Sequence, residues 1–421
     1  MNKIGLCLII FTLFASRLAL AEEVTLSLEE AVVLALRDNS DILLKAEEIE
    51  KAKAKIAEAN AALFPTLNFT STYSQTLGLY SNNLSQDSFQ LTLKEYLYKG
   101  GKIINTIEQN KQKLVVASLL LEKAKLETVL KVKKAFLTLL LSQEFTKLNK
   151  EILDNTEKHL DSLKERYKKG EASESDILRI ESPFAAAKEA FEAALSDVDA
   201  TRELLRNLLY LSEEVNIKPK GEFIYSGRQI ALSEAFLKAL KERPEIKQYA
   251  AQEEADKKAI EIAKADARPS IYVSGDYYNR SHLSATEARN RNDYAVAGIT
   301  LSWPIFDGWL TKAKIEQAIS DLRQTQLTKE KIIKDIALEL RQAYLGLKDA
   351  LAKIRTKFSE LLFFKDNFSV VKQKYEEGLA SSLDLEDTAL KYNLSLFNQK
   401  QAIYDYLLAS ADFEKASGES R

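Results

Sequence analysis

The sequence predicts a mainly α protein with a smaller β component, in which long coiled-coil helical hairpins occur twice in tandem. The first observation is a heptad seam from Ile333 to Tyr375, with apolar residues at alternating steps of three and four and only Lys357 out of place. Such spacing, kept over about six heptads, holds one helical stripe against a partner helix. The second is a pair of matching turns 208 positions apart, and the third is a switch to period-two alternation after Pro65 and Pro269.

Residues 1–21 are predicted to be a secretory signal peptide, in which Lys3 precedes an apolar run and a small-x-small cleavage site at Ala19–Ala21. The apolar run is too short to span a bilayer comfortably and Arg17 interrupts it, which disfavours a transmembrane anchor. Cys7 lies inside this segment, so the mature chain is expected to contain no cysteine for disulfide or thiol chemistry. The protein is therefore expected to leave the cytoplasm.

The composition fits a helix-rich protein with much solvated surface, since 29% of the residues are charged and 9% are aromatic. The net charge at pH 7 is only −2. A chain so nearly neutral gives no reason to expect nucleic acid as a partner.

The mature chain divides into two repeats joined by a linker. The first repeat is predicted over residues 22–211, the linker over 212–229 and the second repeat over 230–418. In each repeat, helices are followed by a strand hairpin and then by a long helical hairpin. The strand hairpins are expected at about 65–98 and 269–304, and the tips of the helical hairpins at 167–176 and 375–384.

The strands begin after Pro65 and Pro269, because a proline disfavours helical geometry in the residue before it. Apolar residues then recur at every second position, which predicts strands with one apolar and one polar face. Polar stretches at Tyr80–Asp87 and Asn279–Asp293 are expected to separate the two strands of each hairpin. The alternating apolar residues include Leu67, Phe69, Tyr73, Phe89, Leu91 and Leu93 in the first repeat and Ile271, Val273, Tyr277, Ala295, Ala297, Ile299 and Leu301 in the second.

Four strands per chain are too few to close a barrel alone. A small soluble sheet packed on the helices would explain the alternation equally well. Strands of roughly 9 to 11 residues and a secreted chain favour transmembrane strands instead. Closure of a barrel would then require several copies of the chain.

The longest helix is expected from Lys102 to Lys169, a stretch without a breaker that would be about 100 Å long at 1.5 Å per residue. Gly170 and Gly378 can take the left-handed conformation that ends a helix. Return helices are expected at Ser173–Leu211 and Ser381–Lys415. The two tips match residue by residue, because Tyr167, Gly170 and Asp176 correspond to Tyr375, Gly378 and Asp384.

In this duplicated order of elements the chain resembles the outer-membrane efflux family typified by TolC. The resemblance covers nearly all of the mature chain and includes the Trp303–Gly308 turn, which is similar to the family's proline, leucine, phenylalanine, aspartate, glycine turn. It also includes the twin Tyr-x-x-Gly tips. It implies four transmembrane β-strands per chain, a homotrimer that closes a 12-stranded β-barrel in the cell outer membrane, and a helical tunnel in the periplasm.

The resemblance also implies the function. The trimer would be the passive exit duct of a tripartite efflux or type I secretion system, set in outer-membrane lipid. Its partners would be a periplasmic adaptor (membrane fusion) protein and an inner-membrane pump of the RND or ABC type. No cofactor is implied.

Carried over residue by residue, the resemblance makes Gly170 and Gly378 the tips that contact the adaptor. Asp384 and Asp387 match the acidic residues that ring the constricted tunnel entrance. From the residues alone, these two carboxylates lie on one helical face and are equally explained as solvated first-turn residues favoured by the helix dipole.

Asp176 and Tyr375 match a hydrogen-bonding pair that helps to hold the entrance of the family's channels shut. Packing alone also explains Tyr375, because it ends the heptad seam. One departure concerns Ala380, two positions after Gly378, where the best-known family member has an arginine gate link. The latch of this chain is therefore expected to be looser or differently built.

An enzyme is not expected. His159 and His282 are far apart in the chain, on a predicted helix and a predicted loop, and no cysteine remains after the signal peptide. Neither a nucleophile with its base nor a histidine-rich metal site is predicted.

The rival interpretation is a soluble periplasmic coiled-coil scaffold or adaptor. An adaptor has one helical hairpin between compact β domains, whereas this chain has two hairpins and two strand pairs.

Overall fold

The computed structural model describes residues 23–79, 82–221, 223, 225, 231–284 and 287–419, and the expected signal peptide lies outside them. The helices are α1 (Leu28–Asp38), α2 (Ser40–Ala61), α3 (Lys102–Lys168), α4 (Glu174–Leu208), α5 (Leu232–Glu242), α6 (Pro244–Ala265), α7 (Leu310–Glu376) and α8 (Ser382–Ser417). The strands are β1 (Glu23–Leu26), β2 (Thr66–Leu79), β3 (Asn82–Lys99), β4 (Asn216–Pro219), β5 (Ser270–Ser284) and β6 (Glu287–Ser302).

The chain folds into two compact units, each made of three segments of sequence. The first unit comprises Met1–Asn39, Lys131–Ser226 and Ala352–Leu408. The second unit comprises Ser40–Leu130, Gly227–Leu351 and Ala409–Arg421. The helices α3 and α7, of 67 residues each, contribute to both units.

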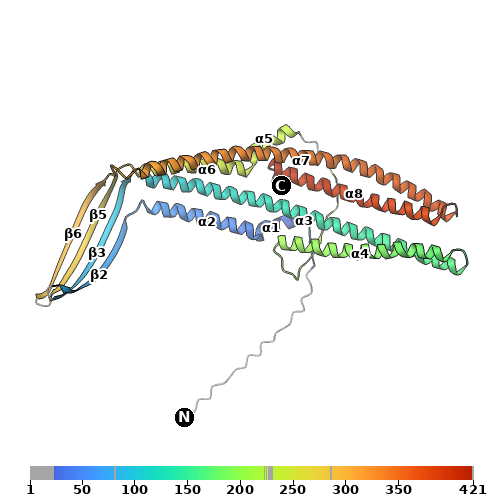
Figure 1. The fold of residues 1–421 in the computed structure, drawn as a ribbon, viewed down its shortest axis with the longest axis horizontal. Helices are drawn as coiled ribbons and strands as arrows, with labels where there is room; N and C mark the ends of the chain where they lie inside the picture. The colour runs from blue at the N-terminus through green and yellow to red at the C-terminus, as the bar shows by residue number, and fades with distance from the viewer. Residues whose placement is uncertain are drawn as a thin grey trace, which may run out of the picture. The chain divides into compact units, whose positions relative to one another are not determined.

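The second unit contains a four-stranded antiparallel sheet in the order β2-β3-β5-β6 (Figure 1). The polar stretches expected to separate the strands are themselves mostly strand, since β2 runs to Leu79, β3 begins at Asn82, β5 runs to Ser284 and β6 begins at Glu287. The prediction that polar stretches separate the strands was wrong, because backbone hydrogen bonds between strands form whether or not the side chains are apolar. His282 accordingly lies on β5 and not in a loop.

The first unit contains a second, smaller sheet that the sequence did not predict. β1 and β4 pair in parallel, with Val24 opposite Ile217, and β4 lies inside the expected linker. Strands of four residues are too short for a period-two pattern to stand out. This pair borders a core of buried residues that includes Val132, Phe136, Leu139, Leu205 and Ile217.

The heptad seam of α7 faces the interior, as predicted. Ile336, Leu340, Leu347 and Ile354 are all less than 5% exposed, and the remaining seam positions are buried or half-buried. The long helices also match their expected bounds within a few residues. The seam is therefore a packing surface along α7 from Ile333 to Tyr375.

Buried charges in the second unit join α6, α7 and α8. Arg243, only 3% exposed, donates from Nη2 to Glu339 Oε2 (2.9 Å) and to Glu245 Oε1 (3.1 Å), and from Nη1 to the Lys415 carbonyl oxygen (3.0 Å). Lys415 Nζ donates to Glu339 as well. Burial opposes ionisation of Glu339, but the Lys415 bond and the Arg243 charge outweigh it and hold its pKa below the ordinary value. Glu339 therefore stays ionised at neutral pH.

The change from strand to helix after β3 depends on Gly100. Its φ is +62°, and a Cβ placed there would lie 2.6 Å from the Ala265 carbonyl oxygen. The same turn is held by Arg268, which donates to the Gly100 carbonyl oxygen at 3.1 Å. Nearby, Asp266 accepts from Lys102 (2.6 Å) and Lys314 (3.0 Å), so α3, α6 and α7 are joined where the strands end.

Candidate functional site

One face of the four-stranded sheet is apolar and exposed in the single chain. Leu67 is 63% exposed, Phe69 68%, Ile299 74% and Leu301 64%. Side chains two positions apart on a strand share a face, and the register places Leu91 and Leu93 on β3 and Val273 and Tyr277 on β5 on this face too. Glu95, opposite Val273, is a charged residue on the same face. A monomeric soluble protein rarely exposes a contiguous apolar surface on this scale, so this face needs an apolar environment.

The opposite face of the sheet is polar. Thr92 on β3 donates to Asp276 Oδ1 on β5 at 2.6 Å, and Gln90 Nε2 lies 3.2 Å from the same oxygen and 3.1 Å from the Tyr278 hydroxyl. Asn68 and Thr70 on β2 lie opposite Thr92 and Gln90 in the register. A sheet with one apolar and one hydrogen-bonded face suits a wall between lipid and water.

The tips of the two helical hairpins have the same backbone geometry. Gly170 and Gly378 both have φ +75°. In each tip the glycine N–H bonds the carbonyl three residues earlier, and the next N–H bonds the carbonyl five residues earlier. This is the Schellman pattern that ends a helix at a left-handed residue. No atom lies within 4 Å of a Cβ built on either glycine, so both tips are open on that side.

Asp176 and Asp384 each close a capping box after their tip. The Asp384 carboxylate accepts from the Ser381 backbone N–H (3.1 Å) and Oγ (2.6 Å), while the Asp384 N–H donates to Ser381 Oγ (3.1 Å). Asp176 makes the same three bonds with Ser173. The serine hydroxyl bond and the serine backbone bond lower the pKa of both carboxyls, and each residue starts a return helix.

Asp387 lies one turn further along α8 and pairs with Lys391 through a 2.6 Å contact. Both side chains of this pair are about half exposed. The structure thus places Asp384 and Asp387 on the exposed start of α8. Their role at a constricted entrance stays a prediction, because it depends on further copies of the chain.

The structure does not bring Asp176 and Tyr375 together by a hydrogen bond within the described residues of this single chain. The Tyr375 hydroxyl lies 3.3 Å from His159 Nε2 and accepts from Arg166 Nη1 at 3.4 Å. The His159 and Tyr375 rings also meet edge to face. Burial lowers the pKa of His159, so the imidazole is neutral at neutral pH and can accept from the phenol. The gate pair stays a prediction.

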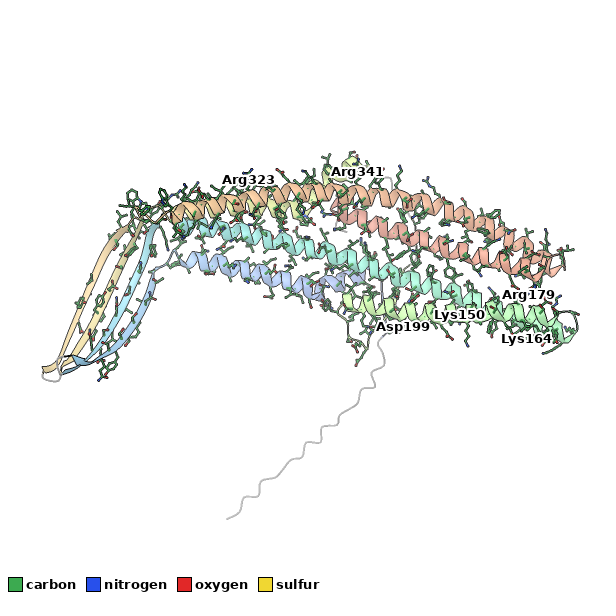
Figure 2. All side chains as sticks on the ribbon, viewed as in Figure 1. Lys150, Lys164, Arg179, Asp199, Arg323 and Arg341 are labelled. Atoms are coloured by element: carbon green, nitrogen blue, oxygen red, sulfur yellow. The ribbon has the colours of Figure 1, made fainter. Side chains whose placement is uncertain are left out.

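Sequence reasoning missed the partners of Tyr375. His159 is one of only two histidines, and its heptad distance from Arg166 places both on one face of α3. This seven-residue spacing was the feature of the sequence that could have identified the two residues as partners on one helical face. Figure 2 shows Lys164 on α3 and Arg179 on α4, whose basic side chains lie near the tip of the first hairpin.

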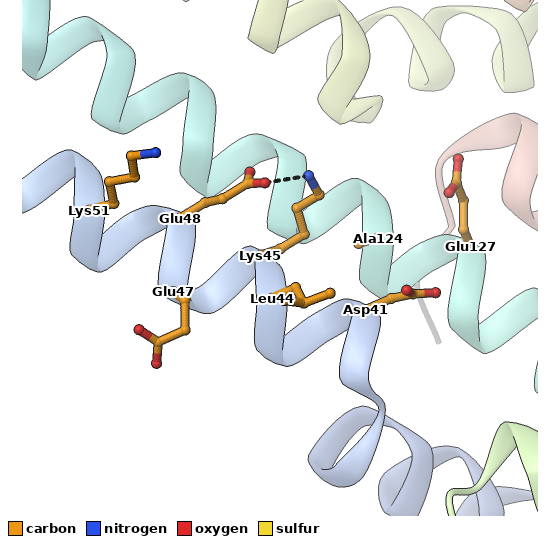
Figure 3. Close-up of a pocket in the computed structure, with 8 residues that line it drawn as sticks. All are labelled: Asp41, Leu44, Lys45, Glu47, Glu48, Lys51, Ala124 and Glu127. Carbon is orange, nitrogen blue, oxygen red and sulfur yellow. Dashed lines mark hydrogen bonds and ion pairs between the residues drawn. The ribbon is translucent and has the colours of Figure 1, made fainter.

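A surface hollow of about 520 Å³ lies between α2 and α3 and is lined almost entirely by charged side chains (Figure 3). Lys45 and Glu48, three residues apart on α2, pair at its edge at 2.8 Å. Apolar, enclosed lining is typical of small-molecule sites, and this hollow lacks it. Within the residues that the structure describes, no three His, Cys, Asp or Glu side chains are grouped to hold a metal ion.

Comparison with known proteins identifies the family. The model of the family described as outer membrane efflux protein matches residues 31–209 and 236–419. The chain belongs to the outer membrane efflux protein family. It is 22% identical over 424 residues to the alkaline protease secretion protein AprF of Pseudomonas aeruginosa, covering 95% of this chain and 86% of that protein.

Solved structures share the fold of this outer membrane efflux protein. The CmeC outer membrane channel of Campylobacter jejuni matches with a TM-score of 0.79 and 16% identity, over 94% of this chain and 87% of that one. The open state of the MtrE outer membrane channel of Neisseria gonorrhoeae matches with a TM-score of 0.77 and 18% identity, over 93% and 88%. The family and these structures are channels and not enzymes.

Family membership confirms the predicted mainly α fold class with strands, the outer-membrane location with helices in the periplasm, and the role of an exit duct. Closure of a 12-stranded barrel by three copies stays a prediction. The rival interpretation as a soluble scaffold or adaptor is not supported. Among the described helices, none has a stretch long and apolar enough to cross a membrane.

Proposed function

We propose that three copies of this chain form one passive duct through the outer membrane, which receives cargo from a periplasmic adaptor and an inner-membrane pump. The two-faced sheet carries this proposal. Its apolar face requires lipid, its polar face requires water, and its four strands cannot close without other copies. Each repeat, 22–211 and 230–418, supplies one strand pair and one helical hairpin.

The adaptor is proposed to dock at the tips around Gly170 and Gly378, which are exposed and share one backbone geometry. Asp384 and Asp387 are proposed to face the entrance, with Asp176 and Tyr375 contributing to its closure. AprF is named for the secretion of an alkaline protease, and this similarity favours a type I secretion assembly, with an ABC-type pump, over drug efflux.

Three measurements test the proposal. Purified protein in a planar bilayer should give discrete conductance steps, and chemical crosslinking in detergent should stop at the trimer. Crosslinking in cells, followed by identification of the copurified proteins, should recover an adaptor and an inner-membrane pump. Protein that washes off membranes without detergent and gives no conductance would refute the duct.

A further inference from the structure

The polar face of the sheet changes character next to the helices. Tyr96 on β3 lies directly opposite Tyr272 on β5, and their rings meet edge to face with centroids 5.5 Å apart. Lys94 Nζ lies 3.9 Å from the centroid of the Tyr272 ring and 4.8 Å from that of Tyr96, while Lys99 Nζ lies 4.4 Å from that of Tyr96. These four residues form one unit, named here the lysine–tyrosine cluster.

The register places this cluster on the polar face. Lys94 and Tyr96 follow Thr92 at steps of two, and Thr92 bonds Asp276 on that face. A bulge in β3 between Tyr96 and Tyr98 shifts the alternation by one residue. Lys99 therefore lies on the same face of the sheet as Tyr96, whereas without the bulge it would lie on the opposite face.

The two ammonium groups of the cluster have aromatic rings as neighbours and no carboxylate. In the part of the chain that the structure describes, no ion pair joins Lys94 or Lys99 to an acidic side chain, whereas Lys102, just beyond them, pairs with Asp266 at 2.6 Å. An aromatic ring attracts a cation but does not neutralise its charge. The Asp276 carboxylate on the same face bonds Thr92, and its single negative charge does not balance the two lysine charges. The cluster is thus a local excess of positive charge.

We propose that the lysine–tyrosine cluster is a binding site for aromatic organic anions, such as aryl sulfonates or aryl carboxylates, inside the duct. The acid group of the ligand contacts the ammonium groups through charge-assisted hydrogen bonds, and its ring packs on Tyr96 or Tyr272. The site rests on the proposed trimer, in which symmetry repeats the two lysines three times around the water-filled passage. Like charges facing one narrow passage raise the local concentration of the opposite charge.

The test uses pyrene trisulfonate as the probe, added to the strand side of purified channels in a planar bilayer. Wild-type protein should be blocked by the dye, and inorganic sulfate at the same charge concentration should block far less because it lacks a ring. The double variant Lys94→Gln and Lys99→Gln should weaken the block at least about tenfold, since both charge-assisted contacts are lost. Tyr272→Leu should weaken the block of the dye and leave that of sulfate unchanged.

Lys312→Gln is the matched control, because the Lys312 ammonium also lies over an aromatic ring, that of Trp309 at 5.7 Å, but at the start of α7. The dye should block the Lys312→Gln variant as strongly as it blocks the wild type. Equal block in the double variant and the wild type, or equal block by sulfate and dye, would overturn the assignment. Fluorescence anisotropy of the dye with solubilised protein reports binding without conductance, so loss of the duct and loss of the cluster site are distinguishable.

Discussion

Replacing Leu67 by Arg tests whether the apolar face of the sheet contacts lipid. In the register, Leu67 lies opposite Leu93, which lies opposite Gly275. Two further rows of outward positions follow on either side, as far as Leu301 in one direction and Phe89 in the other. At about 3.4 Å per residue and a tilt of about 40°, two rows span about 10 Å along the membrane normal.

The row that contains Leu67 is the middle one of these five outward rows, which fit within an apolar band about 25 Å tall. An arginine near the bilayer midplane costs about 2 to 4 kcal/mol per chain, which corresponds to a loss of about 30-fold to 700-fold in the assembly equilibrium. Folding into lipid vesicles, followed against urea concentration, measures this loss directly.

Asn68→Arg is the matched control, because Asn68 is the next residue, at the same depth, on the polar face opposite Thr92. It should cost less than about 1 kcal/mol, as surface substitutions usually do. If Leu67→Arg and Asn68→Arg fold into vesicles equally well, the apolar face does not contact lipid and the proposed barrel is wrong.

Three further predictions concern the tips and the buried charges. Gly170→Val and Gly378→Val should reduce crosslinking to the adaptor while trimers still assemble, because a β-branched residue is strained at φ +75°. Changing Asp384 and Asp387 to Asn should abolish the block of conductance by multivalent cations from the periplasmic side. The Ser381 hydroxyl lowers the pKa of Asp384, so this carboxylate is ionised throughout the ordinary carboxyl range and loses its charge only as the pH falls through the lowered pKa. Because the block needs the ionised carboxylate, the wild-type block should persist into acid. Arg243→Ala should destabilise the protein by about 3 to 5 kcal/mol in thermal unfolding, because Glu339 and Glu245 lose their buried partner.

Two of these predictions have a control in the chain. Gly346→Ala, in the middle of α7 with open space around it, should leave adaptor crosslinking unchanged. Arg37→Ala removes an exposed pair with Asp38 and should change stability little. Wild-type cation block in the double Asn variant would make Asp384 and Asp387 ordinary helix-start residues.

The fold was predictable where a period persisted over many residues. The heptads of α7 and the alternation after Pro65 and Pro269 each require one face to be buried or shielded, so the pattern itself contains the constraint. Tip geometry was predictable for a different reason. Few residues other than glycine take φ +75°, which is why Gly170 and Gly378 identify the turns.

The strand ends and the charge partners were not predictable in this way. The ladder from β5 to β6 continues through polar residues as far as Ser284 and Glu287, where no apolar face exists to leave a pattern. The buried position of Arg243 depends on residues nearly 100 and more than 170 positions away. Such contacts are set by the packing of α6, α7 and α8, which local periodicity does not encode.

The two tips show why a repeat in the sequence does not imply a repeat in the contacts. Tyr167 and Tyr375 occupy the same position before equivalent glycine turns, yet Tyr167 is 46% exposed while the Tyr375 hydroxyl contacts His159 and Arg166. The residue 208 positions after His159 is Asn367, which has no imidazole. A phenol that accepts from a guanidinium and donates to a neutral imidazole needs both partners. The second tip is therefore bonded to α3 through His159 and Arg166, whose equivalents in the second repeat are Asn367 and Lys374, so the two hairpins differ in the contacts that hold their tips.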